Sequence, residues 1–290
     1  MKLITLNSHS LIEEHYEEKF SRFIKGILAE QPDLLALQEV NQDMTEAEVP
    51  LSELKETGFH PVPSSPVPIR RGNHGLRCAE ELARLGFPLH WTWVSAKTGY
   101  DRFDEGLALF SPFPIRYPDA FYLTNSQSYQ NWRTRKALMA AFETPWGLQY
   151  VCNLHMGRWE DEEEPFALQW QRLSSRLASL KEQRVWLMGD FNAPAHHRGQ
   201  SLDMILEQGW LDTCRLAGHP EDDPRDYTVE DGIDGWEDRS LGGGMRIDYI
   251  FTNHPVSVSS SRVIFHPERY GTVSDHRAVE AEVLLSPFLK

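Results

Sequence analysis

The sequence contains few cysteines. Only Cys78, Cys152 and Cys214 occur among its 290 residues, and they lie far apart. An odd number this small excludes a disulfide framework and is too sparse for a thiolate zinc site. We therefore expect three reduced thiols in or near the core.

Long hydrophobic runs are also missing. No stretch approaches the roughly 18 continuous apolar residues that a membrane span needs. Residues 2–6 already have the pattern of a strand, and no separate apolar segment with a cleavage site precedes them. The sequence therefore predicts a cytoplasmic protein with no membrane partner.

Positive charge is scarce. Lys and Arg number 29 against 43 Asp and Glu, which gives a formal net charge of −14 at pH 7. A protein that coats nucleic acid needs a basic surface to displace counterions, so this composition argues against non-specific nucleic-acid binding. Hydrophobic residues make up 40% of the chain, which is enough for a large core.

Helix and strand patterns alternate through the chain, which predicts one α/β domain over residues 1–290. Apolar residues at helical spacing predict helices over 20–28, over 78–85 and after Pro165. Apolar runs predict strands over 2–6, 33–38, 89–94, 106–110, 137–142, 148–154, 185–188, 246–251 and 278–285. Residues 41–77, with five prolines, are predicted to form a long surface loop.

Polar side chains gather where the predicted strands end. They are Asn7, Glu39, His155, Asp190 and Asn192 after strands, Asp248 within the strand that begins at Arg246, and Asp275 and His276 before the last strand. Ligands of open α/β sheets bind at strand ends, so we expect these side chains to converge on one edge.

The residue types in this set indicate metal-dependent chemistry. Carboxylate and carboxamide oxygens are the ligands that Mg²⁺ or Mn²⁺ prefers, and no thiolate accompanies them. The two histidines add proton-transfer groups near neutral pH. Each residue alone also has a structural explanation, because Asn7 could cap a helix and Asp190 or Asp275 could stabilise a turn.

Six motifs carry a family resemblance. They are Leu6-Asn7, Leu37-Gln-Glu-Val40, Asn153-Leu-His155, Gly189-Asp-Phe-Asn192, Arg246-Ile-Asp-Tyr-Ile-Phe251 and Val273-Ser-Asp-His276. In order and spacing they are similar to the motifs of the endonuclease/exonuclease/phosphatase superfamily, also called DNase I-like. The resemblance implies a four-layered α/β sandwich, in which helices flank two packed mixed sheets, and metal-dependent hydrolysis of a phosphoester.

The resemblance also implies a role for each residue. Glu39 would be the principal metal ligand with Asn7 nearby, and Asp190, Asn192 and Asp275 would contribute metal or water contacts. His155 and His276 would flank the scissile phosphate, and Asp248 would orient a histidine. Asp190 or His276 could activate the water, and the sequence leaves open which histidine donates a proton.

A second set of residues bears on the substrate. Residues 99–108, 133–135 and 233–238 resemble the branch of bacterial cytosolic members that contains maltose 6'-phosphate phosphatase. Tyr100 and Trp236 are candidate stacking surfaces for a sugar, and Arg133 and Arg135 are candidate phosphate ligands. Candidate acceptors for sugar hydroxyls are Asp234, Glu237 and Asp238. Each assignment has an alternative. Trp236 could instead be a core residue, and Arg133 and Arg135 could be exposed charges that balance nearby acids.

The acidic run Glu160–Glu164 is expected to be a solvated loop that repels a polyanionic strand. The preferred function is therefore a Mg²⁺- or Mn²⁺-dependent phosphatase for a sugar phosphate or another small phosphomonoester, with no protein partner indicated. The alternatives are a DNA-directed endonuclease or exonuclease, and a non-catalytic ligand-binding protein on the same fold.

Overall fold

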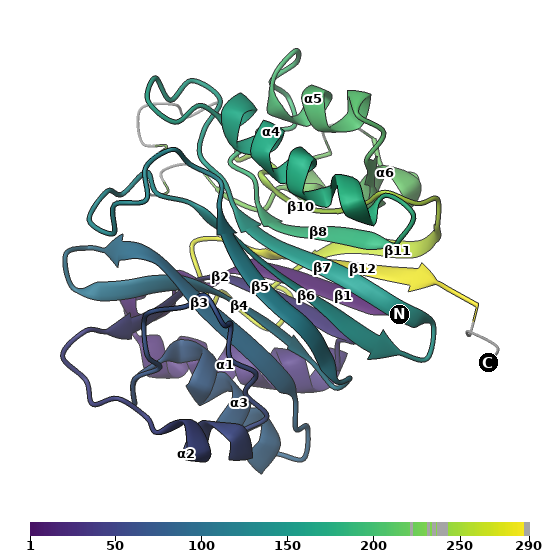
Figure 1. The fold of residues 1–290 in the computed structure, drawn as a ribbon. Coiled ribbons are helices and arrows are strands. Elements are labelled where there is room, and N and C mark those ends of the chain that lie inside the picture. The colour runs from purple at the N-terminus through teal and green to yellow at the C-terminus, as the bar shows by residue number, and fades with distance from the viewer. Residues whose placement is uncertain (221–222, 231–232, 234–235, 237–242, 287–290) are drawn as a thin grey trace.

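Two six-stranded β-sheets pack face to face in the computed structural model, which describes residues 1–220, 223–230, 233, 236 and 243–286 (Figure 1). The first sheet has the order β11-β12-β1-β2-β4-β3, and the second has the order β5-β6-β7-β8-β10-β9. The pairs β1/β2 and β7/β8 are parallel and the other neighbours are antiparallel, so both sheets are mixed.

The strands of the first sheet are β1 (Lys2–Asn7), β2 (Leu34–Asp43), β3 (His90–Gly99), β4 (Phe103–Ser111), β11 (Ser257–Ile264) and β12 (Ala278–Leu284). Those of the second are β5 (Ile115–Tyr122), β6 (Lys136–Thr144), β7 (Gly147–His155), β8 (Val185–Asp190), β9 (Leu211–Asp212) and β10 (Asp248–Thr252). Short 3₁₀ helices are η1 (Ser10–Ile12), η2 (Ala178–Leu180) and η3 (Pro224–Asp226).

Helices cover the two outer faces of the sandwich. Figure 1 shows α1 (Tyr16–Glu30), α2 (Leu51–Glu56) and α3 (His74–Arg84) on the side of the first sheet. On the side of the second sheet lie α4 (Phe166–Leu177), α5 (Ser201–Glu207) and α6 (Thr213–Leu216). The predicted four-layered sandwich is confirmed. Among the described residues, no helix is both long and apolar enough to cross a membrane.

Three apolar clusters fill the spaces between these layers. The cluster between the sheets includes Leu3, Leu107, Phe142, Trp186 and Ile250. A second cluster packs α1 and α3 against the first sheet, and a third packs α4 and α5 against the second. All three cysteines are free and buried, as their isolation in the sequence predicted.

The predicted surface loop over residues 41–77 is wrong at both ends, and it also contains the helix α2. Strand β2 continues to Asp43, and α3 begins at His74 rather than at Cys78. The Asn73 side chain accepts a hydrogen bond from the Leu76 N–H and caps α3. This capping residue was the available sequence signal for the earlier start.

Strands β5 and β11 were not predicted. Each lies at the edge of its sheet, where only one side of the strand is paired within the described part of the chain. Most residues of β5 are half-buried or exposed, and serine and other half-exposed residues fill much of β11. Their weak apolar pattern follows from this edge position.

Candidate active site

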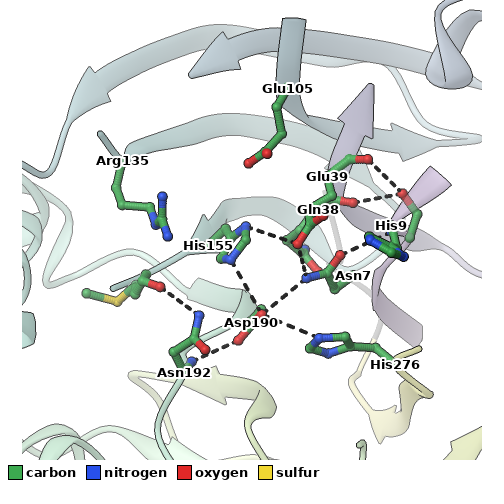
Figure 2. Close-up of polar contacts among 12 residues, drawn as sticks. Asn7, His9, Gln38, Glu39, Glu105, Arg135, His155, Asp190, Asn192 and His276 are labelled. Carbon is green, nitrogen blue, oxygen red and sulfur yellow. Dashed lines mark hydrogen bonds and ion pairs between the residues drawn. The ribbon is translucent and has the colours of Figure 1, made fainter. Parts of the chain in front are cut away.

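The carboxyl ends of the two parallel strand pairs meet at one edge of the sandwich. Asn7 lies opposite Gln38 in the first sheet, and His155 lies opposite Asp190 in the second. Figure 2 shows the side chains from both sheets around one space. We call the following five residues the floor: Asn7, Glu39, His155, Asp190 and His276.

The floor residues contact one another across the two sheets. Asn7 Nδ2 donates to Glu39 Oε1 at 2.9 Å and to Asp190 Oδ2 at 3.2 Å. The His155 ring lies between the same two acids, with Nδ1 4.0 Å from Glu39 Oε1 and Nε2 3.6 Å from Asp190 Oδ2. His276 Nε2 lies 3.9 Å from Asp190 Oδ2, so this oxygen is the centre of the floor.

The backbone at the floor adopts conformations that most side chains avoid. Glu39, at a bulge of β2, has a φ of 50°, and Asn192 has a φ of 47°. A residue in this region costs on the order of 1–3 kcal/mol, so the surrounding structure must hold it there. A Cβ at Gly189 would lie 1.9 Å from the Leu154 carbonyl oxygen, so only glycine lets β8 approach β7 this closely before Asp190.

A buried amide pair joins the two sheets beneath the floor. Gln38 Nε2 donates to Asn153 Oδ1 at 2.6 Å. Asn153 Nδ2 in turn donates to the carbonyl oxygens of Leu37 and Ala108, each at 2.8 Å. These bonds satisfy buried polar groups and fix the position of one sheet relative to the other.

His276 is held by a buried carboxylate. Its Nδ1 lies 2.9 Å from Asp248 Oδ2, and both side chains are almost fully buried. Burial alone would lower the pKa of His276, but the Asp248 and Asp190 carboxylates outweigh it and hold the pKa well above its usual value. Asp248 begins β10, two residues later than the predicted start of this strand.

His155 lies in the opposite electrostatic environment. Burial, and next the positive charges of Arg135 and Lys97, lower the pKa of His155 well below its ordinary value. The floor therefore contains one histidine that is held charged, His276, and one that is held neutral, His155.

The acidic side chains of the floor suit a hard cation. Burial, and next Glu105, raise the pKa of Glu39, while burial and Asp248 raise the pKa of Asp190 to about 7. Among the described residues, neither Glu39 nor Asp190 forms an ion pair with a lysine or arginine. These crowded carboxylate oxygens match the ligands that Mg²⁺ or Mn²⁺ prefers.

Asp275 lies at the side of the floor, near a histidine that the sequence did not single out. The Asp275 N–H donates to Glu13 Oε1 at 3.0 Å, and Asp275 Oδ1 lies 3.8 Å from His9 Nδ1. Burial lowers the pKa of His9, but Glu13 and Asp275 outweigh it and raise the pKa to about 9. His9 Nε2 is 3.1 Å from the Tyr100 hydroxyl, so His9 connects Asp275 to the cavity mouth.

A cavity of about 410 Å³ opens above the floor. Tyr100, Trp132 and Arg133 line it, and we call these three residues the rim. The side chains of Tyr100 and Trp132 are large and well exposed, with 51% and 56% of their surfaces accessible. The Arg133 guanidinium lies over the Trp132 ring and pairs with Asp161 at 3.0 Å.

Arg135 lines the same cavity from deeper in the wall. Its Nη1 donates to the carbonyl oxygens of Trp132 at 2.7 Å and of Thr134 at 3.3 Å. The residue is 9% exposed, and its buried Nε has no hydrogen-bond partner among the residues that the structure describes. Arg133 and Arg135 therefore both line one cavity, as their spacing of two residues predicted.

Trp236 also lines the cavity, although it is only 4% exposed. Its Nε1 donates to Asn192 Oδ1 at 3.0 Å, and Asn192 Nδ2 donates to the Met156 carbonyl oxygen at 2.9 Å. Asp190 Oδ1 accepts the Asn192 backbone N–H at 2.8 Å, which connects Trp236 to the floor. The predicted hydroxyl acceptors Asp234, Glu237 and Asp238 lie outside the described residues.

The acidic run Glu160–Glu164 is not simply a solvated loop. The buried Glu164 carboxylate accepts the N–H groups of Asn125 at 2.9 Å and Ser126 at 2.7 Å. Asp161 pairs with Arg133, as described above. The run therefore has a partly structural role. Asp161 and Glu164 hold the part of the cavity wall that lies beside the rim.

One buried ion pair in the cavity wall was missed. Lys97 Nζ lies 2.6 Å from Glu105 Oε1, and each side chain is less than a tenth exposed. The predicted strands ended at residue 94 and began at residue 106, so both residues were left outside regular structure. Strands β3 and β4 include them, and the available signal was the alternation of charged and small residues beyond the apolar runs.

Comparisons with solved structures agree with this fold. An endonuclease/exonuclease/phosphatase family protein from Leptotrichia buccalis has 28% identity and a TM-score of 0.84, with 98% of this chain and 100% of that one covered. The mannosyl-6-phosphatase of Bacteroides thetaiotaomicron has 15% identity and a TM-score of 0.59 over 98% and 100% of the chains. Truncated Caenorhabditis elegans TDP2 has 17% identity and a TM-score of 0.60 over 98% and 97%.

A comparison with curated protein sequences gave no significant match. A family-level comparison matched residues 4–276 to the Endonuclease/Exonuclease/phosphatase family. This range includes all six motifs and every floor residue. The chain therefore belongs to the endonuclease/exonuclease/phosphatase family, whose members are metal-dependent phosphoester hydrolases.

Proposed function

We propose that this chain is a divalent-metal-dependent phosphatase that hydrolyses a sugar phosphate or another small phosphomonoester. The observation that carries the proposal is the cavity of about 410 Å³ above the floor. Sites for small ligands typically have volumes of about 300–1,000 Å³. A phosphorylated monosaccharide or disaccharide fits this range, whereas a nucleic-acid strand would need a longer groove.

The chemistry of the wall supports a small sugar phosphate over a polyanion. More acidic than basic side chains line the cavity, and the whole chain carries a net charge of −14. The exposed Trp132 ring is available to stack on the apolar face of a sugar. The mannosyl-6-phosphatase of B. thetaiotaomicron offers a precedent for such a substrate on this fold.

We assign metal binding to oxygen donors of the floor and its side. Glu39 is the principal ligand, with Asp190 and Asp275 close to it, and Asn7 holds Glu39 and Asp190 together through its Nδ2. A bound Mg²⁺ or Mn²⁺ would polarise a phosphoryl oxygen and stabilise charge on the leaving oxygen. Asn192 contributes less to the metal, because Trp236 already occupies its carboxamide oxygen.

We assign phosphate binding and proton transfer to the two histidines and Asp190. Since Asp248 holds His276 charged, we assign His276 to donate a hydrogen bond to a phosphoryl oxygen. Asp190, whose Oδ2 lies 3.6 Å from His155 Nε2 and 3.9 Å from His276 Nε2, accepts the proton of the attacking water. Asn192 positions that water, and the neutral His155 with Arg135 supports the phosphate from the other side.

A phosphate-release screen tests the proposed function. It compares sugar phosphates, nucleotides and inositol phosphates, with a plasmid-nicking assay beside it, in Mg²⁺, in Mn²⁺ and in chelator. We expect metal-dependent phosphate release from sugar phosphates and negligible nicking. Efficient nicking without monoester hydrolysis would favour the nuclease, and specific binding without turnover of any phosphoester would favour a non-catalytic protein.

A further inference from the structure

Cys214, His219 and Asp226 form a cluster of metal-ligating side chains outside the cavity. Asp226 Oδ2 lies 3.2 Å from Cys214 Sγ, and both oxygens of Asp226 lie 2.9 Å from His219 Nδ1. One ligand atom from each of the three residues lies within 4.8 Å of the others. None of these residues lines the cavity, so the cluster is separate from the proposed phosphate site.

Local structure brings the three side chains together. Asp212 caps the short helix α6 through the Cys214 N–H at 3.0 Å, which fixes Cys214. Gly218, with a φ of 87°, turns the chain so that the His219 N–H donates to the Cys214 carbonyl oxygen at 3.3 Å. Asp226 comes from η3, where the side chain of Asp223 accepts the Arg225 N–H.

The donor set differs from that of the floor. Thiolate, imidazole and carboxylate together favour a borderline metal such as Zn²⁺ over Mg²⁺. Zinc bonds of about 2.0–2.3 Å in tetrahedral geometry separate neighbouring ligand atoms by about 3.3–3.6 Å. The separations of 3.2 Å and 2.9 Å to Asp226 are within a few tenths of an ångström of these values.

Charge also favours a cation at this position. Asp226 and Cys214 are both 4% exposed. Among the described residues, Asp226 forms an ion pair only with His219. The neighbouring Asp212, by contrast, pairs with the guanidinium of Arg246 at 2.7 Å. A buried carboxylate needs a compensating charge. A divalent ion bound to the Cys214 thiolate, the Asp226 carboxylate and neutral His219 would leave the cluster electrically neutral.

We propose that Cys214, His219 and Asp226 bind a structural Zn²⁺ or a similar borderline metal ion. On binding, the Cys214 thiol releases its proton to solvent, and thiolate, imidazole and carboxylate each donate one electron pair to the ion. The site contains only one thiolate, so it differs from the thiolate zinc sites that the scarcity of cysteine excludes.

The ion would strengthen a segment that supports the floor. Thr228, two residues after Asp226, accepts the N–H groups of Ile247 at 3.1 Å and Asp248 at 3.3 Å with its hydroxyl oxygen. The Thr228 carbonyl oxygen accepts the Arg277 N–H at 2.6 Å. Fastening Asp226 to α6 therefore stabilises the chain beside Asp248 and His276.

Cobalt spectroscopy tests the site directly. Chelator-treated full-length protein is titrated with Co²⁺, which gives a thiolate-to-cobalt absorption band only where a cysteine binds the ion. We expect this band in the wild type and in the control Cys152→Ala, and its loss in Cys214→Ser. Because the proposed floor ligands contain no sulfur, Co²⁺ bound at the floor cannot give the band. A wild type that binds Co²⁺ without it, or a band that survives Cys214→Ser, would overturn the proposal.

Thermal unfolding provides a second test that does not depend on Cys214. Zn²⁺ at a hundredfold excess over its dissociation constant should raise the Tm of the wild type by roughly 5 °C. His219→Ala, in which a partly exposed side chain is removed, should lose most of this shift, and Asp190→Asn should retain it. An equal shift in wild type and His219→Ala would place the zinc elsewhere. The Asp190→Asn variant separates this result from failure of the proposed phosphatase site.

Discussion

The floor and the rim of the cavity are built in different ways. Asn7, His155 and Asp190 lie at strand ends, Glu39 lies at a bulge inside β2, and His276 lies just before β12. Their side chains contact one another over distances of 2.9–4.0 Å. The rim residues come from the β3–β4 turn and from the segment before β6, and they are held by contacts such as the Arg133–Asp161 ion pair. The rigid floor is therefore suited to the chemical step, and the rim, which is built on loops, is suited to substrate selection.

Burial follows the same division. Asp190 and His276 are at most 4% exposed, so their charges interact strongly and their pKa values move far from the ordinary range. Tyr100 and Trp132 are more than half exposed. Substitutions in the floor should therefore change the rate of the chemical step, and substitutions in the rim should change substrate affinity.

The largest expected effect comes from the centre of the floor. Asp190→Asn removes the carboxylate that lies between both histidines, so we expect kcat to fall by about 10²–10⁴-fold at saturating metal. His276→Ala should have a similar effect, because it removes the charged donor. Phosphate release under steady-state conditions measures both.

Asp119→Asn is the matched control for that substitution. Asp119 lies on the edge strand β5 and pairs with Arg176 at 2.5 Å, away from the cavity. Its kcat should stay within about twofold of wild type, since surface ion pairs contribute little. Near wild-type turnover in both Asp190→Asn and His276→Ala would refute the proposed mechanism.

A smaller effect is expected at the rim. Trp132→Ala removes the exposed ring, and aromatic stacking contributes about 0.5–1.5 kcal/mol, so KM for a sugar phosphate should rise about two- to tenfold. The kcat should change little, because Trp132 does not contact the floor. Steady-state kinetics with a sugar phosphate and with glycerol phosphate distinguish stacking from a general loss of structure.

Trp146→Ala is the control for Trp132→Ala. Trp146 lies in the β6–β7 turn and lines a different surface hollow from the proposed site. It should leave KM for both substrates unchanged. An equal increase of KM for glycerol phosphate and the sugar phosphate in Trp132→Ala would contradict a stacking role.

The same division explains what the sequence could predict. Floor residues follow apolar strands at short, fixed offsets, so the pattern around Asn7, Glu39 and Asp190 predicted their convergence on one edge. Whether His155 is neutral and His276 charged could not be predicted, because those states depend on neighbours far away in the chain. Asp248, which holds His276 charged, is 28 residues from it.

The rim and the walls were predicted less completely. The spacing of Arg133 and Arg135 placed both on one side, but the partner Asp161 comes from a run that looked like a solvated loop. His9 carried no signal of its own, because it follows the end of a strand in an unusual backbone conformation. Glu105 was missed because it lay outside the predicted strands. Such residues are defined by tertiary contacts rather than by local pattern.

Substitution of a buried carboxylate outside the floor and the rim should change the stability of the protein without changing its activity. Glu280 on β12 is 1% exposed and lies near the buried Glu30, and burial together with Glu30 raises the pKa of Glu280 to about 7 from 4.5. Between pH 4.5 and 7 the folded state binds more protons than the unfolded state, so this group makes the wild type less stable as pH rises. Glu280→Gln mimics the protonated form and removes this dependence.

Compared with wild type, Glu280→Gln should therefore melt at least about 2 °C higher at pH 8 and at about the same temperature at pH 4.5. Its kcat should stay within about twofold, since Glu280 lines neither floor nor rim. Glu282→Gln, at an exposed position on the same strand, should show no such pH-dependent difference. The proposed effect arises from ionisation of Glu280 above its raised pKa, which destabilises the wild type. A difference in Tm that is constant with pH, or that is larger at pH 4.5, would therefore contradict the raised pKa of Glu280.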